Sequence, residues 1–303
     1  MHEMEKFLVA ITGPTAAGKT AMSIALAKAF GTEIISADAR QVYQEMKTGT
    51  ARPTSEELEA VNHQLVGHLS VHEDYNAARY ASEARAALDQ LFDQHDVALV
   101  CGGSGLYLQA LIDGIDEIPE VPQEIRKELN EIFAEKGLPW LQQEAEQSDP
   151  DWYARVDQQN PRRLMRAVEV FRHSGKPISF FQSQKSNPLP CQIIRIGLWL
   201  PRPLLYQRID NRVDQMLQDG LWEEAEILYP LRHLQALQTV GYREFFDCMD
   251  GKIDHAEAVR LVEQNTRHYA KRQMTWFRNV EETKWFDFDD KAAVERFIRS
   301  IVG

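Results

Sequence analysis

The sequence predicts an α/β fold in which a parallel sheet carries helices on both faces and a helical domain is inserted. Apolar runs at 7–13, 33–38, 97–103, 194–201 and 283–288 are typical of buried strands. Helical patterns separate these runs, and such alternation indicates a parallel sheet. Strand patterns are absent between 116 and 192. We therefore expect a discontinuous core domain, 1–115 with 193–303, and a helical insertion over 116–192.

Helical spacing of apolar residues supports the individual helices. Residues 18–30 predict a helix after the first strand, and a second over 75–95 would bury Ala77, Ala81, Ala84, Leu88 and Leu91. In the insertion, one amphipathic helix is predicted by Ile125, Leu129, Ile132 and Phe133. Another is predicted by Leu164, Val168 and Phe171.

Composition is that of an ordinary soluble globular protein, with 44% apolar and 26% charged residues among 303. We expect no signal peptide and no membrane-spanning stretch. The three cysteines, Cys101, Cys191 and Cys248, lie far apart, which favours a reducing, cytoplasmic compartment over a disulfide framework. The net charge of −12 argues against nucleic acid as a partner, but acids concentrate in 113–151 and bases in 155–185, so a basic patch remains possible.

The segment GPTAAGKT matches the phosphate-binding pattern G-x-x-x-x-G-K-T and lies between a predicted strand and a predicted helix. This position favours a P-loop NTPase-like core over a chance match in a structural turn. The backbone N–H groups of such a loop face an anion, and the lysine adds charge. The candidate diphosphate-binding residues are Gly13, Pro14, Thr15, Ala16, Ala17, Gly18, Lys19 and Thr20, with the Thr20 hydroxyl as a ligand for Mg²⁺. The loop specifies phosphates and a metal, but no nucleoside.

Two further strand ends should face the same crevice, because ligands bind at the carboxyl ends of parallel strands. Asp38 follows the second strand and is a candidate general base or a support for Mg²⁺, with a helix N-cap as the alternative. The amide of Gln41 could read a base edge. The third strand ends in CGGSG, where small residues would admit a ligand and Ser104 offers a hydroxyl. A tight turn is the alternative there.

Two helices carry basic stripes. After Pro161, three arginines fall on one arc: Arg162, Arg163 and Arg166. Over 256–279, Arg260, Arg267, Lys271 and Arg278 fall near one line, and we expect Ala258, Val262, Tyr269 and Trp276 on the opposite, apolar side. Only Glu263 lies near the second stripe, which favours a phosphate backbone over a merely solvated face. A metal site at His63, His68 and His72 is disfavoured, because their spacing matches no known ligand pattern.

The motifs together resemble those of bacterial tRNA dimethylallyltransferases, also called tRNA isopentenyltransferases. The resemblance rests on GPTAAGKT, ISADARQVYQEMKTGTARPT, GGSGLYLQAL, QNPRRLMRAVEV, GLWEEAE, TVGYRE and TRHYAKRQMTWFRN, which occur in family order over nearly the whole chain. Four positions depart mildly. Ala17 and Ala39 stand where serine is common, Ser104 where threonine is common and Arg52 where lysine is common.

The resemblance implies transfer of the dimethylallyl group from dimethylallyl diphosphate to N6 of the adenosine just 3′ of a tRNA anticodon, with loss of diphosphate and no use of ATP. Asp38 would take the N6 proton, and Ser104 and Arg126 would contact the leaving group or the reacting region. The insertion would grip the anticodon stem-loop. The implied tRNA contacts are Asp38, Ala39, Arg40, Gln41, Ser104, Arg126, Gln159, Asn160, Pro161, Arg162, Arg163, Thr239, Val240, Gly241, Tyr242 and Arg243.

The second basic stripe adds Arg267 and Lys271 to these contacts, and we expect a monomer with no membrane partner. Two other functions compete with this interpretation. A small-molecule kinase would place ATP in the loop and use Asp38 toward a hydroxyl. A non-catalytic RNA-binding module would leave Lys19, Thr20 and Asp38 without a purpose.

Overall fold

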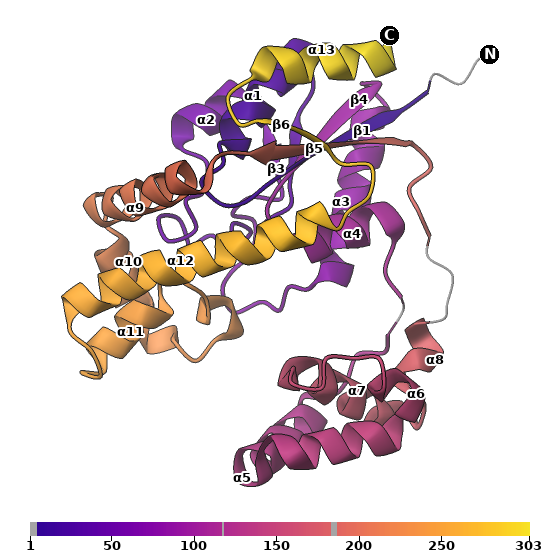
Figure 1. Cartoon of the computed structure of the whole chain (residues 1–303), viewed down its shortest axis with the longest axis vertical. Coiled ribbons are helices and arrows are strands. Elements are labelled where there is room, and N and C mark those ends of the chain that lie inside the picture. Colours follow the sequence, from indigo (N-terminus) through magenta and orange to yellow (C-terminus); the bar gives the residue numbers. More distant parts are fainter. Residues whose placement is uncertain (1–4, 117, 183–186) are drawn as a thin grey trace. The chain divides into compact units, whose positions relative to one another are not determined.

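The computed structural model describes residues 5–116, 118–182 and 187–303. The chain forms two compact units, one of residues up to 113 together with 188–303, and one of residues 114–187. The first unit is built on a parallel sheet of six strands in the order β3-β2-β4-β1-β5-β6 (Figure 1). The strands are β1 (Phe7–Thr12), β2 (Ile34–Ser36), β3 (His63–Gln64), β4 (Val97–Cys101), β5 (Gln192–Trp199) and β6 (Lys284–Asp287).

The predicted parallel sheet with helices on both faces is confirmed. The prediction missed β3, because this strand has only two residues, both polar and half-buried, and so leaves no apolar run. The central strand β1 pairs with β4 from Phe7↔Val97 and with β5 from Phe7↔Gln192. This pairing brings the carboxyl ends of the strands to one edge, where the loops that follow β1, β2 and β4 meet.

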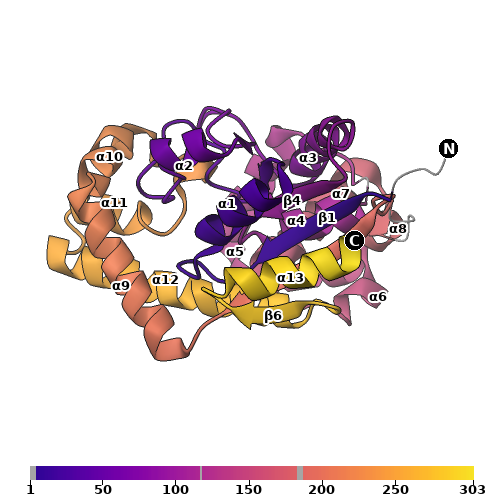
Figure 2. The same ribbon diagram turned by 90° about the horizontal axis from the view of Figure 1, so that it is seen from above.

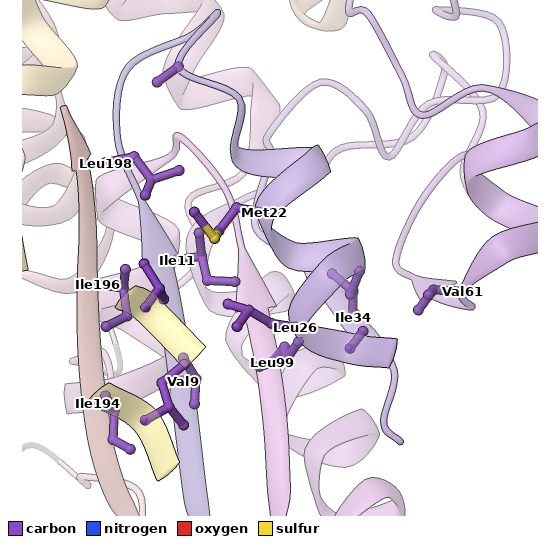
Figure 3. Packing of buried hydrophobic residues seen from close by; sticks show 14 of the residues in the cluster. Val9, Ile11, Met22, Leu26, Ile34, Val61, Leu99, Ile194, Ile196 and Leu198 are labelled. Atoms are coloured by element: carbon purple, nitrogen blue, oxygen red, sulfur yellow. The ribbon is translucent and has the colours of Figure 1, made fainter. Parts of the chain in front are cut away.

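One face of the sheet is covered by α1 (Lys19–Phe30), α9 (Arg202–Gln218) and α13 (Lys291–Val302). Val9 and Ile11 point to this side, and Figure 3 shows Met22 and Leu26 of α1 packed over the strands there. Each such side chain contributes roughly 1.5–3 kcal/mol when fully buried. The uninterrupted apolar sequence of β1 is explained by the helices on both of its faces.

The opposite face is covered by α3 (Ala77–Phe92) and α4 (Gly105–Asp113), and Phe277 of α12 (His255–Arg278) packs there too. Leu8 and Ala10 point to this side, in alternation with Val9 and Ile11. The predicted helix over 75–95 is confirmed, and its five expected apolar residues are all buried.

A third apolar cluster joins the loop after β2 to helices at one end of the unit (Figures 1 and 2). It involves α10 (Leu221–Leu228), α11 (Arg243–Met249) and the neighbouring parts of α9 and α12, around the fully buried Tyr242 and Phe245. The first unit also contains α2 (Ser55–Ala60) and two 3₁₀ turns, η1 (Tyr229–Leu231) and η2 (Gln235–Leu237).

The second unit is helical, with α5 (Gln123–Ser148), α6 (Pro150–Tyr153), α7 (Pro161–Ser174) and α8 (Ile178–Gln182). Leu129 of α5 packs against Leu164 and Val168 of α7, as their spacing predicts. Phe171 was predicted to lie on the buried face of α7 as well. This prediction is wrong, because its side chain is 37% exposed. The insertion was predicted to extend to residue 192, but the second unit ends earlier. The Leu189 N–H already donates to the Ile112 carbonyl of the first unit, and Gln192 begins β5.

Within the described residues, no helix combines the length and apolar character needed to cross a bilayer.

Candidate active site

A cavity of about 590 Å³ opens at the carboxyl edge of the sheet. Its walls come from the loop after β1, the turn after β2, the loop after β4, the 239–241 segment, and side chains of α9, α10 and α12. The cavity contains Lys19 and Thr20 of the phosphate-loop motif and Asp38, together with Arg40 and Gln41. Residues from distant parts of the sequence therefore surround one space.

The backbone of the GPTAAGKT loop has the curled form that directs N–H groups at an anion. Gly13, Ala16 and Gly18 have φ of +148°, +63° and +80°. Gly13 cannot be replaced without strain, because a Cβ there would lie 2.9 Å from the Leu198 carbonyl oxygen. The helix α1 starts at Lys19 with no side-chain cap, so its first N–H groups remain available to a ligand.

Three cations surround this loop. Lys19 Nζ donates to the Pro14 carbonyl at 2.8 Å, and Arg208 Nε donates to the Ala16 carbonyl at 2.8 Å. The pKa of Lys19 is lowered to about 8, chiefly by burial and also by Arg212, against the opposing effects of Cys101 and Asp38. Burial also lowers the pKa of Arg212, with Arg208 acting in the same direction. The cluster is electrostatically unfavourable by itself and would be relieved by a bound anion.

Sequence reasoning missed both arginines. They lie four residues apart in RIDNR of α9, a spacing that puts Arg208 and Arg212 on one helix face. Such a pair could have been noticed, but nothing local indicates that this face borders the phosphate loop 190 positions upstream.

Asp38 is held by the turn that it begins. Its Oδ1 accepts from the N–H of Arg40 at 2.9 Å and of Gln41 at 3.2 Å, while Oδ2 makes no hydrogen bond with the described residues. The helix N-cap alternative is wrong, because residues 39–42 form turns and no helix follows. The preceding Ala37 donates to the Cys101 carbonyl at 2.8 Å, which fixes the turn to β4. One carboxylate oxygen is therefore anchored and the other is free.

Ser104 lies against the same turn. Its Oγ accepts from the Ala39 N–H at 3.0 Å, and its own N–H donates to the Ala37 carbonyl at 3.2 Å. The structure thus brings the predicted pair Asp38 and Ser104 together. Ala39, predicted as an RNA contact, contributes its N–H to this bond.

The glycines after β4 are required by the protein's own packing, and Gly102 and Gly103 also line the cavity. A Cβ on Gly102 would lie 2.0 Å from the Ala37 carbonyl oxygen, and one on Gly103 would lie 2.2 Å from the Gln273 amide. Gln273 of α12 is buried, accepts from the Thr15 N–H at 2.8 Å and donates to the Gly103 carbonyl at 2.9 Å. It therefore ties the phosphate loop to the loop after β4, a role that sequence reasoning missed.

The Gln41 side-chain amide has fewer atoms free to contact a base than the sequence suggested. Its Nε2 donates to the carbonyls of Thr50 and Ala51, both at 3.1 Å. The amide N–H groups are therefore occupied, and only Oε1 is left to accept from a base. The neighbouring Arg40 reaches the Gln235 carbonyl at 3.3 Å.

Within residues 239–243, some residues line the cavity or lie at the surface, and one lies in the core. Thr239, Val240 and Gly241 line the cavity, and the Arg243 side chain is 50% exposed beside Glu244. Tyr242 is fully buried, and its hydroxyl donates to Glu224 at 2.7 Å. The expected direct RNA contact of Tyr242 is therefore corrected to a supporting role.

The prediction that only Glu263 lies near the α12 stripe is wrong. Arg260 is paired with Glu257 at 2.7 Å, and Arg267 is paired with Asp210 of α9 and, at 3.6 Å, with Glu263. Tyr269 and Trp276, expected to be buried, are both 38% exposed. The helix buries Ala258 and Val262, as predicted, together with Ala270, Gln273 and Phe277.

The face of α12 that remains open carries a shallow groove lined by His268, Lys271, Arg272, Thr275, Trp276 and Asn279. Tyr269, next to this groove, also lines the cavity that holds Asp38. Within the predicted stripe, Lys271 is therefore exposed among cationic and aromatic side chains, whereas the Arg267 guanidinium is already paired with carboxylates.

The remaining predicted residues belong to the second unit. Arg126 lies 3.5 Å from the buried Glu169, which Arg166 also approaches at 3.6 Å. Asn160 caps α7 by accepting from the Arg163 N–H at 3.3 Å, and Pro161 opens the helix. Exposed side chains at this end are those of Gln159, Pro161, Arg162 and Arg163.

His63 and His68 make separate contacts. His63 Nδ1 lies 2.9 Å from the Val61 carbonyl, and His68 Nε2 lies 3.2 Å from Glu83. Across the described residues, no group of three or more His, Cys, Asp or Glu side chains could hold a metal ion.

Comparison with known proteins identifies the family. Residues 41–280 match the family model described as IPP transferase. The chain belongs to the IPP transferase family. Among its relatives, a tRNA dimethylallyltransferase of Cytophaga hutchinsonii is 45% identical over 300 residues, which span 99% of each chain. The resemblance drawn from the motifs is thereby confirmed.

Solved structures of IPP transferase relatives share the fold. The tRNA isopentenylpyrophosphate transferase of Bacillus halodurans matches with a TM-score of 0.72 at 35% identity, covering 98% of this chain and 97% of that one. A eukaryotic dimethylallyltransferase, captured acting on tRNA, matches in fold with a TM-score of 0.80 at 24% identity, covering 98% of this chain and 78% of its own.

Proposed function

We propose that this protein is a tRNA dimethylallyltransferase. It transfers the dimethylallyl group of dimethylallyl diphosphate to N6 of adenosine at tRNA position 37, giving N6-(dimethylallyl)adenosine and diphosphate. The observation that carries the proposal is one cavity in which three cations and an uncapped helix N-terminus surround the phosphate loop while Asp38 presents a free carboxylate oxygen. The names of the relatives support the same reaction.

The leaving group is stabilised by the phosphate loop. As the allylic C–O bond breaks, the electron pair leaves with the diphosphate, and negative charge increases on its oxygens. The curled loop, the first N–H groups of α1, and Lys19, Arg208 and Arg212 are arranged to meet this charge. Relief of repulsion among the three cations favours the bound diphosphate.

Asp38 acts on the acceptor. The N6 lone pair is delocalised into the adenine ring, so the new C–N bond requires loss of an N6 proton. Asp38 Oδ2 takes that proton, while Oδ1 stays bonded to Arg40 and Gln41. Ser104 fixes the Asp38 turn through the Ala39 N–H and offers its own hydroxyl proton to the reacting region. Arg126, 44% exposed in the second unit, is proposed to contact the leaving group or the RNA.

The donor set fits Mg²⁺ bound chiefly through the substrate. Thr20, in the first turn of α1, lines the cavity, and Asp38 lines the same cavity. A hydroxyl and few carboxylates, completed by phosphate oxygens and water, are typical of Mg²⁺. When bound, the ion would neutralise charge on the diphosphate. Thr20 is the residue proposed to hold it.

The tRNA anticodon loop must present its acceptor base unstacked, which single-stranded loops allow at low cost. Candidate contacts are Arg40, the Oε1 of Gln41, Thr239, Val240, Gly241 and Arg243, together with the open face of α12. In the second unit, the exposed ends of Gln159, Arg162 and Arg163 are proposed to bind the stem-loop backbone. A cytoplasmic location and a monomeric state stay predictions.

The deciding experiment combines purified protein, Mg²⁺, unmodified tRNA and labelled dimethylallyl diphosphate, followed by nucleoside analysis of the tRNA. We expect label in N6-(dimethylallyl)adenosine at position 37 and release of one diphosphate per group transferred. A parallel reaction with labelled ATP and small alcohols tests the kinase alternative. Unlabelled tRNA together with labelled phosphorylated alcohol would overturn the proposal.

A further inference from the structure

Glu224 of α10 lies at the centre of hydrogen bonds that join three separate segments. Its Oε2 accepts from the backbone N–H of Lys47 at 3.0 Å and of Thr48 at 2.9 Å. Its Oε1 accepts from the N–H of Gly49 at 2.9 Å and from the Tyr242 hydroxyl at 2.7 Å. Three successive N–H groups facing one carboxylate form an anion-binding concavity that the protein fills with its own side chain.

This arrangement depends on close packing of the 47–51 loop. A Cβ on Gly49 would lie 2.5 Å from the Tyr242 ring, so the loop can rest on that ring only with glycine there. The Thr50 hydroxyl donates to the Met46 carbonyl at 2.8 Å, and the Ala51 N–H donates to the Thr48 carbonyl at 2.9 Å. The loop therefore has a defined shape, and Gly49, Thr50 and Ala51 line the cavity.

The same loop leads to Asp38. The carbonyls of Thr50 and Ala51 accept both N–H groups of the Gln41 side chain, and the Gln41 backbone N–H donates to Asp38 Oδ1 at 3.2 Å. A continuous series of bonds thus runs from Glu224 through the 47–51 loop and Gln41 to the carboxylate proposed as the base.

We propose that Glu224 is a positioning residue that sets the orientation of Asp38 toward the acceptor adenine. It touches neither substrate and acts through the 47–51 loop and Gln41. Its effect should fall on turnover rather than on binding of dimethylallyl diphosphate, because the phosphate loop lies on other elements and shares no hydrogen bond with the 47–51 loop among the described residues. The inference rests on the proposed prenyl transfer.

The test compares Glu224→Gln with Glu223→Gln, which removes an exposed carboxylate from the same helix. The glutamine keeps the size but turns an N–H₂ group toward backbone donors. We expect Glu224→Gln to lower kcat roughly 10- to 100-fold, with KM for dimethylallyl diphosphate within about twofold of wild type. Glu223→Gln should match wild type. Tyr242→Phe, which removes one of the four bonds, should have a smaller effect than Glu224→Gln.

Two readouts separate positioning from a general loss of stability. The variant Gln41→Leu breaks the same series, so its effect on kcat should be non-additive with that of Glu224→Gln. Amide hydrogen exchange over 47–51 and 38–43 should speed up in Glu224→Gln while β1 and α1 stay protected. This readout needs no activity, so it tests the bond series even if the wild type proves unable to prenylate tRNA.

Wild-type kcat in Glu224→Gln would overturn the inference. So would a lower melting temperature with normal kcat per folded molecule, and so would full additivity with Gln41→Leu.

Discussion

The two walls of the cavity differ in where their polar groups find partners. On the phosphate wall, the curled loop, the start of α1 and the cations of α9 have N–H groups and positive charges that the protein satisfies only in part. On the acceptor wall, the Asp38 turn, Gln41 and the 47–51 loop bond to one another in series. The phosphate wall is built to receive an external anion, whereas the acceptor wall is fixed in advance around one free carboxylate oxygen.

The largest predicted effect is on the acceptor wall. Asp38→Asn keeps an oxygen that accepts from Arg40 and Gln41 but removes the base, so kcat should fall roughly 10²- to 10⁴-fold. Affinity for tRNA and for dimethylallyl diphosphate, measured by filter binding and calorimetry, should stay close to wild type. A near-normal kcat would remove the general-base role.

On the phosphate wall, the main effect of a substitution should be on substrate affinity. Lys19→Ala removes one of three clustered cations, so it should weaken binding of dimethylallyl diphosphate about 10- to 100-fold. Binding of tRNA should change much less. Equal losses for the two substrates would mean that the two walls do not act separately.

A pH titration sharpens this difference. In the free protein the pKa of Lys19 is lowered to about 8, and a bound diphosphate would raise it. Affinity for dimethylallyl diphosphate without tRNA should therefore be full below pH 8 and decline as the pH rises above 8, with proton uptake on binding. Lys19→Arg, which does not titrate in this range, supplies the control for ionisation of the ligand. A decline of equal size in Lys19→Arg would assign the effect to another group.

The smallest predicted effect concerns α12. Neutralising Lys271 and Arg272 together should reduce the slope of log K for tRNA against log salt by about 1.4, at roughly 0.7 per charge on single-stranded RNA. Arg267→Gln should leave the slope nearly unchanged, because Arg267 is already paired with Asp210 and Glu263. A larger change in this slope for Arg267→Gln than for the double variant would support the sequence prediction that Arg267 contacts the RNA backbone.

The two walls also differ in how far the sequence predicted them. The phosphate loop, its flanking strand and helix, and the position of Asp38 at a strand end follow from local patterns, since each signal lies within about ten residues. Arg208 and Arg212 complete the same wall but lie on α9, so their contribution depends on tertiary packing.

The acceptor wall and α12 were less accessible to prediction. Three of the Glu224 hydrogen bonds come from backbone N–H groups. Every residue except proline carries such a group, so the residue types do not indicate these contacts. Arg267 looked unpaired because its partner Asp210 lies on another helix. Tyr269 and Trp276 were placed on the apolar side by their helical spacing, but both are exposed and α12 buries the polar Gln273.

The separation of the two walls is tested most directly by calorimetric titration of inorganic diphosphate into wild type, Asp38→Asn and Lys19→Ala. Removing the negative charge of Asp38 should leave diphosphate affinity unchanged or increase it, since that charge faces the site, while Lys19→Ala should bind at least tenfold more weakly. Loss of diphosphate binding in Asp38→Asn equal to that in Lys19→Ala would contradict the account.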